Sequence, residues 1–353
     1  MFSTLQFSTV SQDALKRFQA WKRLVRKPTL AVQKQMSLSS SAQLLTVGSC
    51  FVNEIRAVLE RSDLVVHPLI DPELSELFVD EVKSNPAWGQ WDERVHYQFF
   101  TPFTIRQEIE VALKTREQNP DAVLKRRFKG RDVFIDPYRR SVYAKSHQDV
   151  LTLRTRMNEQ LRKGLEVSEL VVMTLGLTEA FRMPRYDLFV SEYSRIIGDE
   201  ELEFVNGTHD QIASELDQTI GLIRSVFPQK KIVLTVSPIP IARTFSGTDA
   251  ITATLRGKSI LRASIDTLTQ RYDNLYYWPS YEYVMFSEGS FRSDDLRHVR
   301  PETVAEITQA FCKAFFNQSV SSKILRVESR HGSSRKPISG AFSMLRSSLR
   351  RSA

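Results

Sequence analysis

Short apolar runs rich in β-branched residues recur along the chain and alternate with longer stretches in which apolar residues lie three or four apart. The short runs occupy residues 44–47, 64–66, 169–175, 231–236 and 274–278. Apolar runs of this length are typical of strands buried on both faces, as in a parallel sheet. The longer stretches predict helices over residues 51–61, 103–116, 147–164, 209–226, 249–271 and 301–317. This alternation predicts an α/β fold, a three-layer α/β/α sandwich around a mostly parallel sheet.

Two segments depart from this alternation. Residues 131–146 hold two apolar runs on either side of a proline-containing turn, which predicts a small hairpin at the sheet edge or in a cap. Residues 67–102 are irregular and contain four prolines. We expect this second segment to cover one end of the sheet.

Charge divides the chain into three parts. The net charge is +8 over 353 residues, but residues 321–353 hold eight basic residues against one acidic residue, and residues 1–42 hold seven against one. The part between them is therefore net negative. We interpret 1–42 as a basic N-terminal arm with one helix near 12–26, 43–320 as the folded domain, and 321–353 as a basic, mobile tail. A duplex-binding domain would be basic within its folded part, so no specific nucleic-acid partner is expected.

The tail contains four apolar residues at helical spacing beside three arginines. They are Ile338, Phe342, Leu345 and Leu349. A solvated tail is the favoured interpretation, and a basic amphipathic helix on an anionic membrane surface is the alternative.

Three features favour a cytoplasmic protein. No run approaches the roughly 20 apolar residues of a membrane span. The first residues lack the basic start and apolar block of a signal peptide. The two cysteines, Cys50 and Cys312, cannot form a disulfide framework, which indicates a reducing compartment.

The first candidate site is Gly48-Ser49-Cys50-Phe51, directly after the first predicted strand and before the first predicted helix. Open α/β sheets place their ligands at the carboxyl ends of strands. A helix N-terminus lowers the pKa of a thiol and stabilises a developing oxyanion, and Gly48 allows the sharp turn that exposes the side chain. The position also suits a buried structural cysteine, so position alone leaves both interpretations open.

The second candidate site is Asp295-Leu296-Arg297-His298, just before the last predicted helix. A spacing of three lets the Asp295 carboxylate orient the His298 imidazole and stabilise it when protonated, as in a catalytic triad. Two other acid–histidine pairs share this spacing, but only this pair lies at a late strand–helix junction.

Five motifs occur in order within roughly residues 43–317. They are GSCF (48–51), TLGLTEAF (174–181), VSPIP (236–240), PSYE (279–282) and DLRH (295–298). In these motifs the chain resembles the GSCFA-domain family, within the wider SGNH (GDSL-type) hydrolase superfamily. The resemblance implies an SGNH-like fold with a five-stranded parallel sheet, a nucleophile in the first block, and Asp and His in the last.

The resemblance also implies roles for individual residues. Aligned with the G-D-S block of the wider group, Cys50 takes the nucleophile position and Ser49 takes the Asp position. This implies a triad of Cys50, His298 and Asp295, in which a thiol beside an imidazole is activated as a thiolate. Ser49 is the second choice of nucleophile.

The segment from Gly176 to Glu179 resembles the G-x-N-D block, whose Asn helps form the oxyanion hole. Thr178 stands at the Asn position, where its hydroxyl could donate. Glu179 could cap a following helix or orient a neighbouring side chain, and the whole segment could equally be the polar end of a central strand.

Three further residues lie on the predicted rim of the site, namely Ser237, Tyr281 and Glu282, where packing or capping competes with substrate contact. Two features depart from the pattern of the wider group. The glycine of its second block has no clear counterpart, and Ile70 lies near that position. Val299-Arg300-Pro301 follows the last-block histidine, where proline or a small residue is usual. These departures leave open a variant pocket or a weakened enzyme.

The resemblance to the SGNH group implies an acyl-transfer enzyme, an O-acyl esterase or O-acetyltransferase that forms a covalent acyl-enzyme, with an acylated small molecule, carbohydrate or polysaccharide precursor as substrate. Hydrolysis requires no cofactor, whereas a transferase would take acetyl-CoA or another acyl thioester as donor. The alternative is a non-catalytic glycan- or peptide-binding module on the same fold. The sequence has no glycine-rich nucleotide motif, no H-E-x-x-H and no histidine–cysteine spacing of a zinc site, so no metal is expected.

Overall fold

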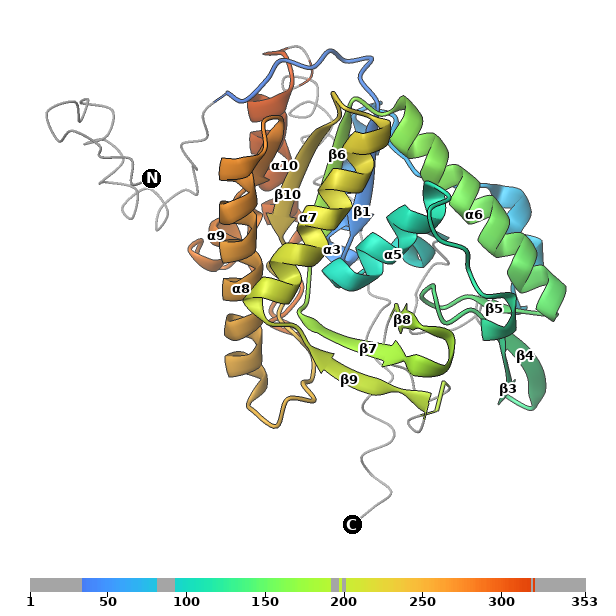
Figure 1. Ribbon diagram of the computed structural model, residues 1–353. Helices are drawn as coiled ribbons and strands as arrows, with labels where there is room; N and C mark the ends of the chain where they lie inside the picture. The colour runs from blue at the N-terminus through green and yellow to red at the C-terminus, as the bar shows by residue number, and fades with distance from the viewer. Residues whose placement is uncertain (1–33, 81–92, 192–196, 199–200, 319, 321–353) are drawn as a thin grey trace, which may run out of the picture.

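The computed structural model describes residues 34–80, 93–191, 197–198, 201–318 and 320 (Figure 1). Its centre is a sheet of five parallel strands in the order β11-β10-β6-β1-β2. The strands are β1 (Leu44–Gly48), β2 (Val66–His67), β6 (Leu170–Leu175), β10 (Lys231–Val236) and β11 (Leu275–Trp278). β1 and β6 are buried along their whole length, which explains why their sequences are apolar on both faces.

Helices cover both faces of this sheet. One face packs against α3 (Cys50–Arg61), α9 (Ser280–Met285) and α10 (Pro301–Phe315). The other packs against α5 (Pro102–Ala112), α6 (His147–Val167), α7 (His209–Val226) and α8 (Ala250–Arg271). Successive strand residues point to opposite faces, so Leu44 belongs to the first core and Leu45 to the second. The predicted three-layer α/β/α sandwich is confirmed.

The predicted strands and helices of the sandwich are all present, with ends shifted by a few residues. The largest strand shift is in β2, because the residues before it are apolar without belonging to the ladder. The short helix α9 was not predicted. The helix expected near 12–26 and the amphipathic segment of the tail lie outside the described residues. Within the described residues, no helix combines the length and the apolar character needed to cross a membrane.

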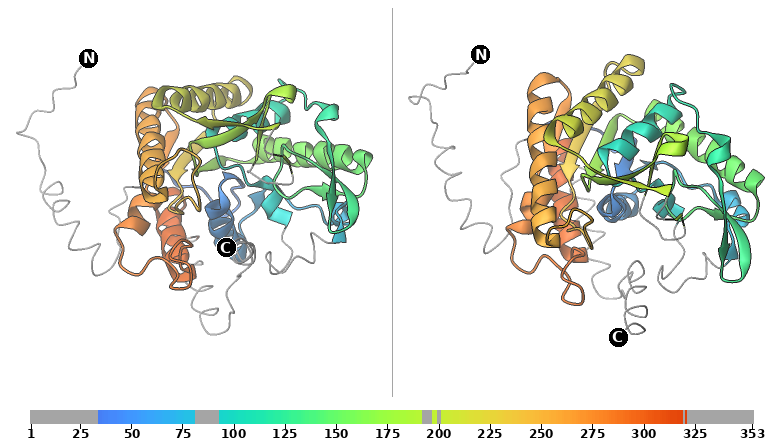
Figure 2. Two further views of the ribbon diagram at one scale, coloured as in Figure 1. Left: turned by 90° about the horizontal axis from the view of Figure 1, so that it is seen from below. Right: turned by 60° about the horizontal axis from the view of Figure 1, so that its bottom comes forward.

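Two small antiparallel sheets lie at one end of the sandwich, beyond the carboxyl ends of the central strands (Figure 2). One contains β3 (Leu124–Phe128), β4 (Arg131–Ile135) and β5 (Tyr143–Ala144), which confirms the predicted hairpin and adds a third strand. The other contains β7 (Glu179–Met183), β8 (Leu188–Val190) and β9 (Glu203–Asn206). Four short 3-10 helices complete the described elements: Pro72–Leu77, Glu93–Tyr97, Pro120–Ala122 and Pro184–Tyr186.

Two buried ion pairs fix the turn between β4 and β5 to the sandwich. Arg139 in this turn lies 2.6 Å from Glu108 of α5, and both side chains are almost fully buried. Asp136 lies 2.9 Å from Arg154 of α6. Separation of the two partners would leave an uncompensated buried charge. The pairs therefore hold the turn in place, including Arg140, which directly follows Arg139.

Candidate active site

The turn between β1 and α3 presents Cys50 at the carboxyl end of the sheet. Gly48 has φ +130°, and a Cβ there would come within 2.2 Å of the Thr174 carbonyl oxygen on β6. Only glycine therefore fits. The Ser49 backbone N–H donates to the same oxygen at 2.9 Å, and Cys50 then begins α3. The motif residues Gly48, Ser49 and Cys50 thus lie where the sequence placed them.

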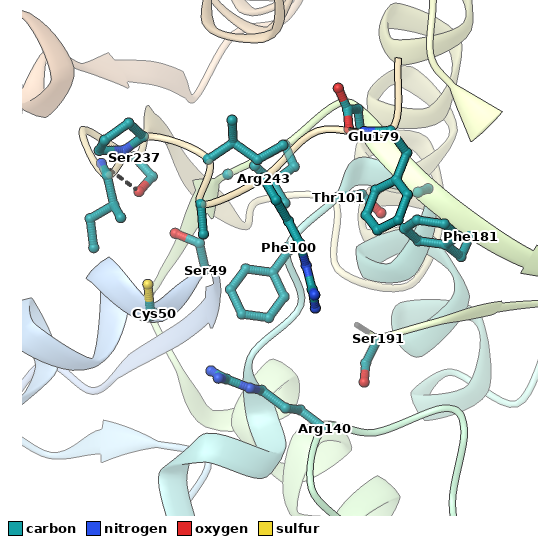
Figure 3. Close-up of a pocket in the computed structure, with 18 of the residues that line it drawn as sticks. Ser49, Cys50, Phe100, Thr101, Arg140, Glu179, Phe181, Ser191, Ser237 and Arg243 are labelled. Atoms are coloured by element: carbon teal, nitrogen blue, oxygen red, sulfur yellow. Dashed lines mark hydrogen bonds between the residues drawn. The ribbon is translucent and has the colours of Figure 1, made fainter. Parts of the chain in front are cut away.

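A pocket of about 180 Å³ opens beside Cys50. Figure 3 shows Ser49 and Cys50 on one side of it and Phe181 and Ser191 on the other, with Phe100 between them. The wall is contributed by the β1–α3 turn, residues 100–101, Arg140, the β6–β7 and β8 segments, the loop 237–245, and Arg297. The first candidate site is therefore part of a cavity rather than a closed structural turn.

The segment before α5 runs beside the end of β1. The Phe99 N–H donates to the Gly48 carbonyl at 2.8 Å, and the Phe100 carbonyl accepts from the N–H groups of Gly176 (3.1 Å) and Leu177 (2.8 Å). This segment lies against the site, whereas Ile70 does not line the pocket. Gly176 lines it, and a Cβ there would come within 2.9 Å of the Ser49 Cβ. Since its N–H is bonded to Phe100, Gly176 supports the turn rather than an oxyanion.

The Asp295–His298 pair is formed in a closed loop before α10. The Arg292 N–H donates to the His298 carbonyl at 2.8 Å. Asp295 Oδ1 accepts from the backbone N–H groups of Arg297 (2.9 Å) and His298 (3.0 Å), and Oδ2 accepts from His298 Nδ1. Although burial alone would raise the pKa of Asp295, these hydrogen bonds hold it at about 2. The carboxylate is ionised and orients the ring, so Nε2 is the nitrogen suited to exchange a proton.

Arg297 and His298 lie differently with respect to the pocket. Among the described residues, the lining includes Arg297, whose guanidinium donates to the Pro240 carbonyl at 3.0 Å, and does not include His298. Partial burial raises the pKa of Glu54, one helical turn after Cys50, and a protonated His298 is close enough to oppose this rise. The Glu54 side chain is still exposed to solvent. The Asp–His pair therefore lies beside the first turns of α3, next to the pocket wall.

Burial and nearby charges together set the pKa of Cys50. Burial raises the pKa of the Cys50 thiol and the Glu54 carboxylate adds to the rise, whereas Arg140, Arg297 and Lys258 oppose it with their positive charges. Because burial prevails, the thiol is protonated at neutral pH, and the thiolate needs a base to take its proton.

Lys258 is a site residue that sequence reasoning missed. It lies on α8, is 2% exposed, and donates from Nζ to the Gly176 carbonyl at 2.7 Å. Burial lowers the pKa of Lys258 to about 7, and the neighbouring Cys50 opposes this shift. The signal in the sequence was its spacing of three, seven and ten from Leu261, Ile265 and Leu268, which puts a lysine on the buried face of the helix.

Thr178 is not brought to the pocket beside Cys50. Its hydroxyl donates to Asn206 Oδ1 at 3.4 Å, and it lies against Gly257 of α8, in a small second cavity that Lys258 also lines. Glu179 does line the main pocket, where its carboxylate accepts from the Thr244 hydroxyl (2.5 Å) and the Phe245 N–H (3.2 Å). Glu179 begins β7 and caps no helix.

Of the three residues predicted on the rim of the site, one lines the pocket and two do not. Ser237 lines the pocket, and its Oγ accepts from the Ile239 N–H at 3.3 Å. Tyr281 and Glu282 do not line it. Glu282 accepts from the Tyr277 hydroxyl at 2.6 Å and from Arg262 Nε at 3.2 Å, so it ties α9 to β11 and α8. In the described part of the chain, no group of three or more His, Cys, Asp or Glu is placed to hold a metal ion.

Comparison with known proteins gives a family and several solved structures of low similarity, among them two carbohydrate esterases. The GSCFA family model matches residues 43–311. A carbohydrate esterase family 3 structure from Talaromyces cellulolyticus is 10% identical and covers 82% of this chain and 99% of its own, with a TM-score of 0.34. A Clostridium thermocellum family 3 carbohydrate esterase is 11% identical and covers 78% of this chain and 94% of its own, with a TM-score of 0.33. No curated protein matches the chain.

Proposed function

The chain belongs to the GSCFA family, and we propose that it is an acyl-transfer enzyme in which Cys50 attacks the carbonyl carbon of an O-acyl ester or acyl thioester. One observation carries the proposal. Cys50 begins α3 at the carboxyl ends of the central strands and lines a pocket whose wall also includes Arg297, the residue before His298 of the Asp295–His298 pair. This is the position in which an α/β sheet presents a nucleophile.

The reaction follows the order of a covalent triad. His298 Nε2 takes the Cys50 proton, and the thiolate attacks the acyl carbonyl to give a tetrahedral oxyanion. When the oxyanion collapses, the bond to the leaving alcohol or thiol breaks, and that group receives the proton from His298. Water or an acceptor alcohol then attacks the thioester on Cys50, gives its proton to His298, and releases the acid or the new ester while Cys50 regains its proton.

The residues around Cys50 supply the electrostatics of this reaction. The N–H groups at the start of α3 point at the carboxyl end of β1 and favour negative charge there. Arg140 and Arg297 add positive charge close to the sulfur. We assign stabilisation of the oxyanion to these groups, in place of Thr178.

The substrate side of the proposal follows the SGNH resemblance. The alcohol component would be a carbohydrate or polysaccharide precursor. An esterase uses water in the second step, whereas an acetyltransferase takes its acyl group from acetyl-CoA or another thioester and passes it to an acceptor hydroxyl.

Initial rates with p-nitrophenyl acetate and with acetyl-CoA test the function. We expect Cys50→Ala and His298→Ala each to lower kcat/KM by about 10³-fold or more, since members of a triad act as a unit. Cys312→Ala is the matched control, because Cys312 is the other thiol of the chain and lies fully buried on the side of α10 that faces the core. Full activity in both Cys50→Ala and Cys50→Ser would overturn the assignment of the nucleophile.

A binding module is the second candidate function. It is favoured by the presence of Arg297, rather than His298, in the pocket wall. It predicts saturable glycan or peptide binding, measured by calorimetry, that Arg297→Ala weakens and His298→Ala leaves unchanged, with no ester turnover in the wild type.

A further inference from the structure

Apolar side chains form much of the pocket wall beyond Cys50. Six of them come from four separate segments: Phe100, Leu177, Phe181, Val190, Ile239 and Ile241. They surround the space that starts at the sulfur of Cys50 and extends towards Phe181 (Figure 3). Burial of apolar ligand surface against such a wall lowers the free energy of binding.

The polar side chains of the same wall mostly serve the protein itself. Thr101 Oγ1 accepts from the Thr104 N–H at 3.2 Å as the cap of α5. Glu179 accepts from Thr244 and Phe245, and Ser237 accepts from Ile239. A sugar ring in this space would have to compete with these bonds for its hydroxyl groups, whereas a hydrocarbon chain would leave them intact.

The size of the space also distinguishes acyl groups. The pocket measures about 180 Å³, roughly ten times the 10–15 Å³ or so that a cavity needs to hold one water. The single methyl of an acetyl group would leave most of this volume unfilled. A chain with several methylenes would fill it and contact the aromatic walls.

We propose that this pocket is an acyl-chain site and that the enzyme prefers linear apolar acyl groups of about four to eight carbons over acetyl. The inference rests on the proposed function, with the acyl carbonyl held at Cys50. The chain extends past Phe100 towards Phe181. The alcohol or thiol that leaves is bonded to the carbonyl carbon and therefore lies at the Cys50 end of the pocket, whereas the far end is lined by Phe181 and Phe245, whose rings pack 4.9 Å apart.

A series of p-nitrophenyl esters from acetate to decanoate tests the chain-length preference. We expect kcat/KM to rise about fourfold per methylene up to hexanoate or octanoate, because each buried methylene contributes about 0.8 kcal/mol, and then to fall. A maximum at acetate would overturn the inference while leaving the proposed function standing. An absence of turnover and of any acyl adduct at every length would instead contradict the proposed function.

Two variants at the side of the pocket opposite Cys50 move the preference in opposite directions. Ser191→Phe fills that side and shifts the optimum to shorter chains, whereas Phe181→Ala enlarges it and shifts the optimum to longer ones (Figure 3). Ser214→Phe, at an exposed position of α7, is the matched control and leaves the optimum unchanged. Unchanged optima in both folded pocket variants would contradict the placement of the chain.

Alkylation of Cys50 by N-alkyl chloroacetamides gives a readout that needs no turnover. The thiolate displaces chloride and forms a thioether, which intact mass records. We expect the N-hexyl reagent to react at least tenfold faster than the N-methyl reagent with wild type. The preference should decrease in Ser191→Phe and remain in Ser214→Phe. Equal rates for both reagents in wild type would overturn the inference even if the enzyme hydrolysed no ester.

Discussion

At the scale of single residues, Lys258 is the unexpected feature of the site. Burial of an ammonium group costs free energy, and Lys258 Nζ donates its hydrogen bond to a carbonyl without formal charge, that of Gly176. Its charge also lowers the pKa of Cys50. We therefore expect Lys258 to lower the pKa of Cys50 and to hold the turn after β6, while its burial lowers the free energy of unfolding.

Lys258→Met tests this cost through pH. The folded-state pKa of Lys258 is about 7 against an ordinary value of 10.5. Between pH 7 and pH 10.5, Lys258 is therefore protonated in the unfolded chain and mostly neutral in the folded protein. Wild-type stability therefore rises with pH above about 7, and Lys258→Met lacks this rise. The stability of the variant relative to wild type should be higher at pH 6 than at pH 9, by roughly 3 kcal/mol. Urea denaturation at the two pH values measures the difference.

The control is Lys313→Met, an exposed lysine of α10. Its stability relative to wild type should be the same at both pH values. Equal differences for Lys258→Met at pH 6 and pH 9 would show that the buried amine keeps its ordinary pKa.

The motifs predicted the place of Cys50 and of the Asp295–His298 pair in the fold, and their catalytic roles stay predictions. A motif does not predict where each side chain points. Thr178 also stood in a block, but its hydroxyl points to Asn206 because β9 pairs alongside β7. A single sequence does not report that distant pairing.

At the scale of elements, the β1–α3 turn positions the whole site. The turn depends on the close contact between Gly48 and Thr174, where β1 and β6 end side by side. A side chain at Gly48 would force the two strand ends apart and tilt the start of α3.

Gly48→Ala should therefore destabilise the fold by several kcal/mol, through both the clash at 2.2 Å and the positive φ. It should also lower the rate of Cys50 alkylation in the fraction that folds. Gly221→Ala, at a position of α7 where the added Cβ would point into open space, should stabilise the protein slightly. Thermal unfolding of both variants checks this, and a Gly48→Ala protein as stable as wild type would refute it.

Most elements of the sandwich were predictable because burial on both faces leaves continuous apolar runs, as in β6 and β10. The β7–β8–β9 sheet was missed for a physical reason. Capping of a following helix was one interpretation of the residues after β6, but they begin β7 instead. Its partner β9 lies about twenty residues further along the chain, and none of its residues is buried. No apolar run marks such a strand.

At the scale of the whole molecule, the pocket is made where the sandwich meets the two small sheets. The central strands supply Cys50, Gly176 and Ser237 at their carboxyl ends, as the fold class predicts. Arg140 comes from the β4–β5 turn, which the buried Arg139–Glu108 pair fixes to α5. The sequence predicted that hairpin but not its contact with the site, because the contact depends on how the small sheets pack on the sandwich.

The central claim is that Cys50 carries the acyl group, and the intact mass of the protein after brief exposure to an activated acyl ester tests it most directly. The account predicts one acyl adduct that maps to Cys50, is absent in Cys50→Ala, and decays with time in wild type. In His298→Ala the adduct should form and decay more slowly, because both steps need the imidazole. An adduct that maps elsewhere, or an unchanged mass with every ester from acetyl to octanoyl, would contradict it.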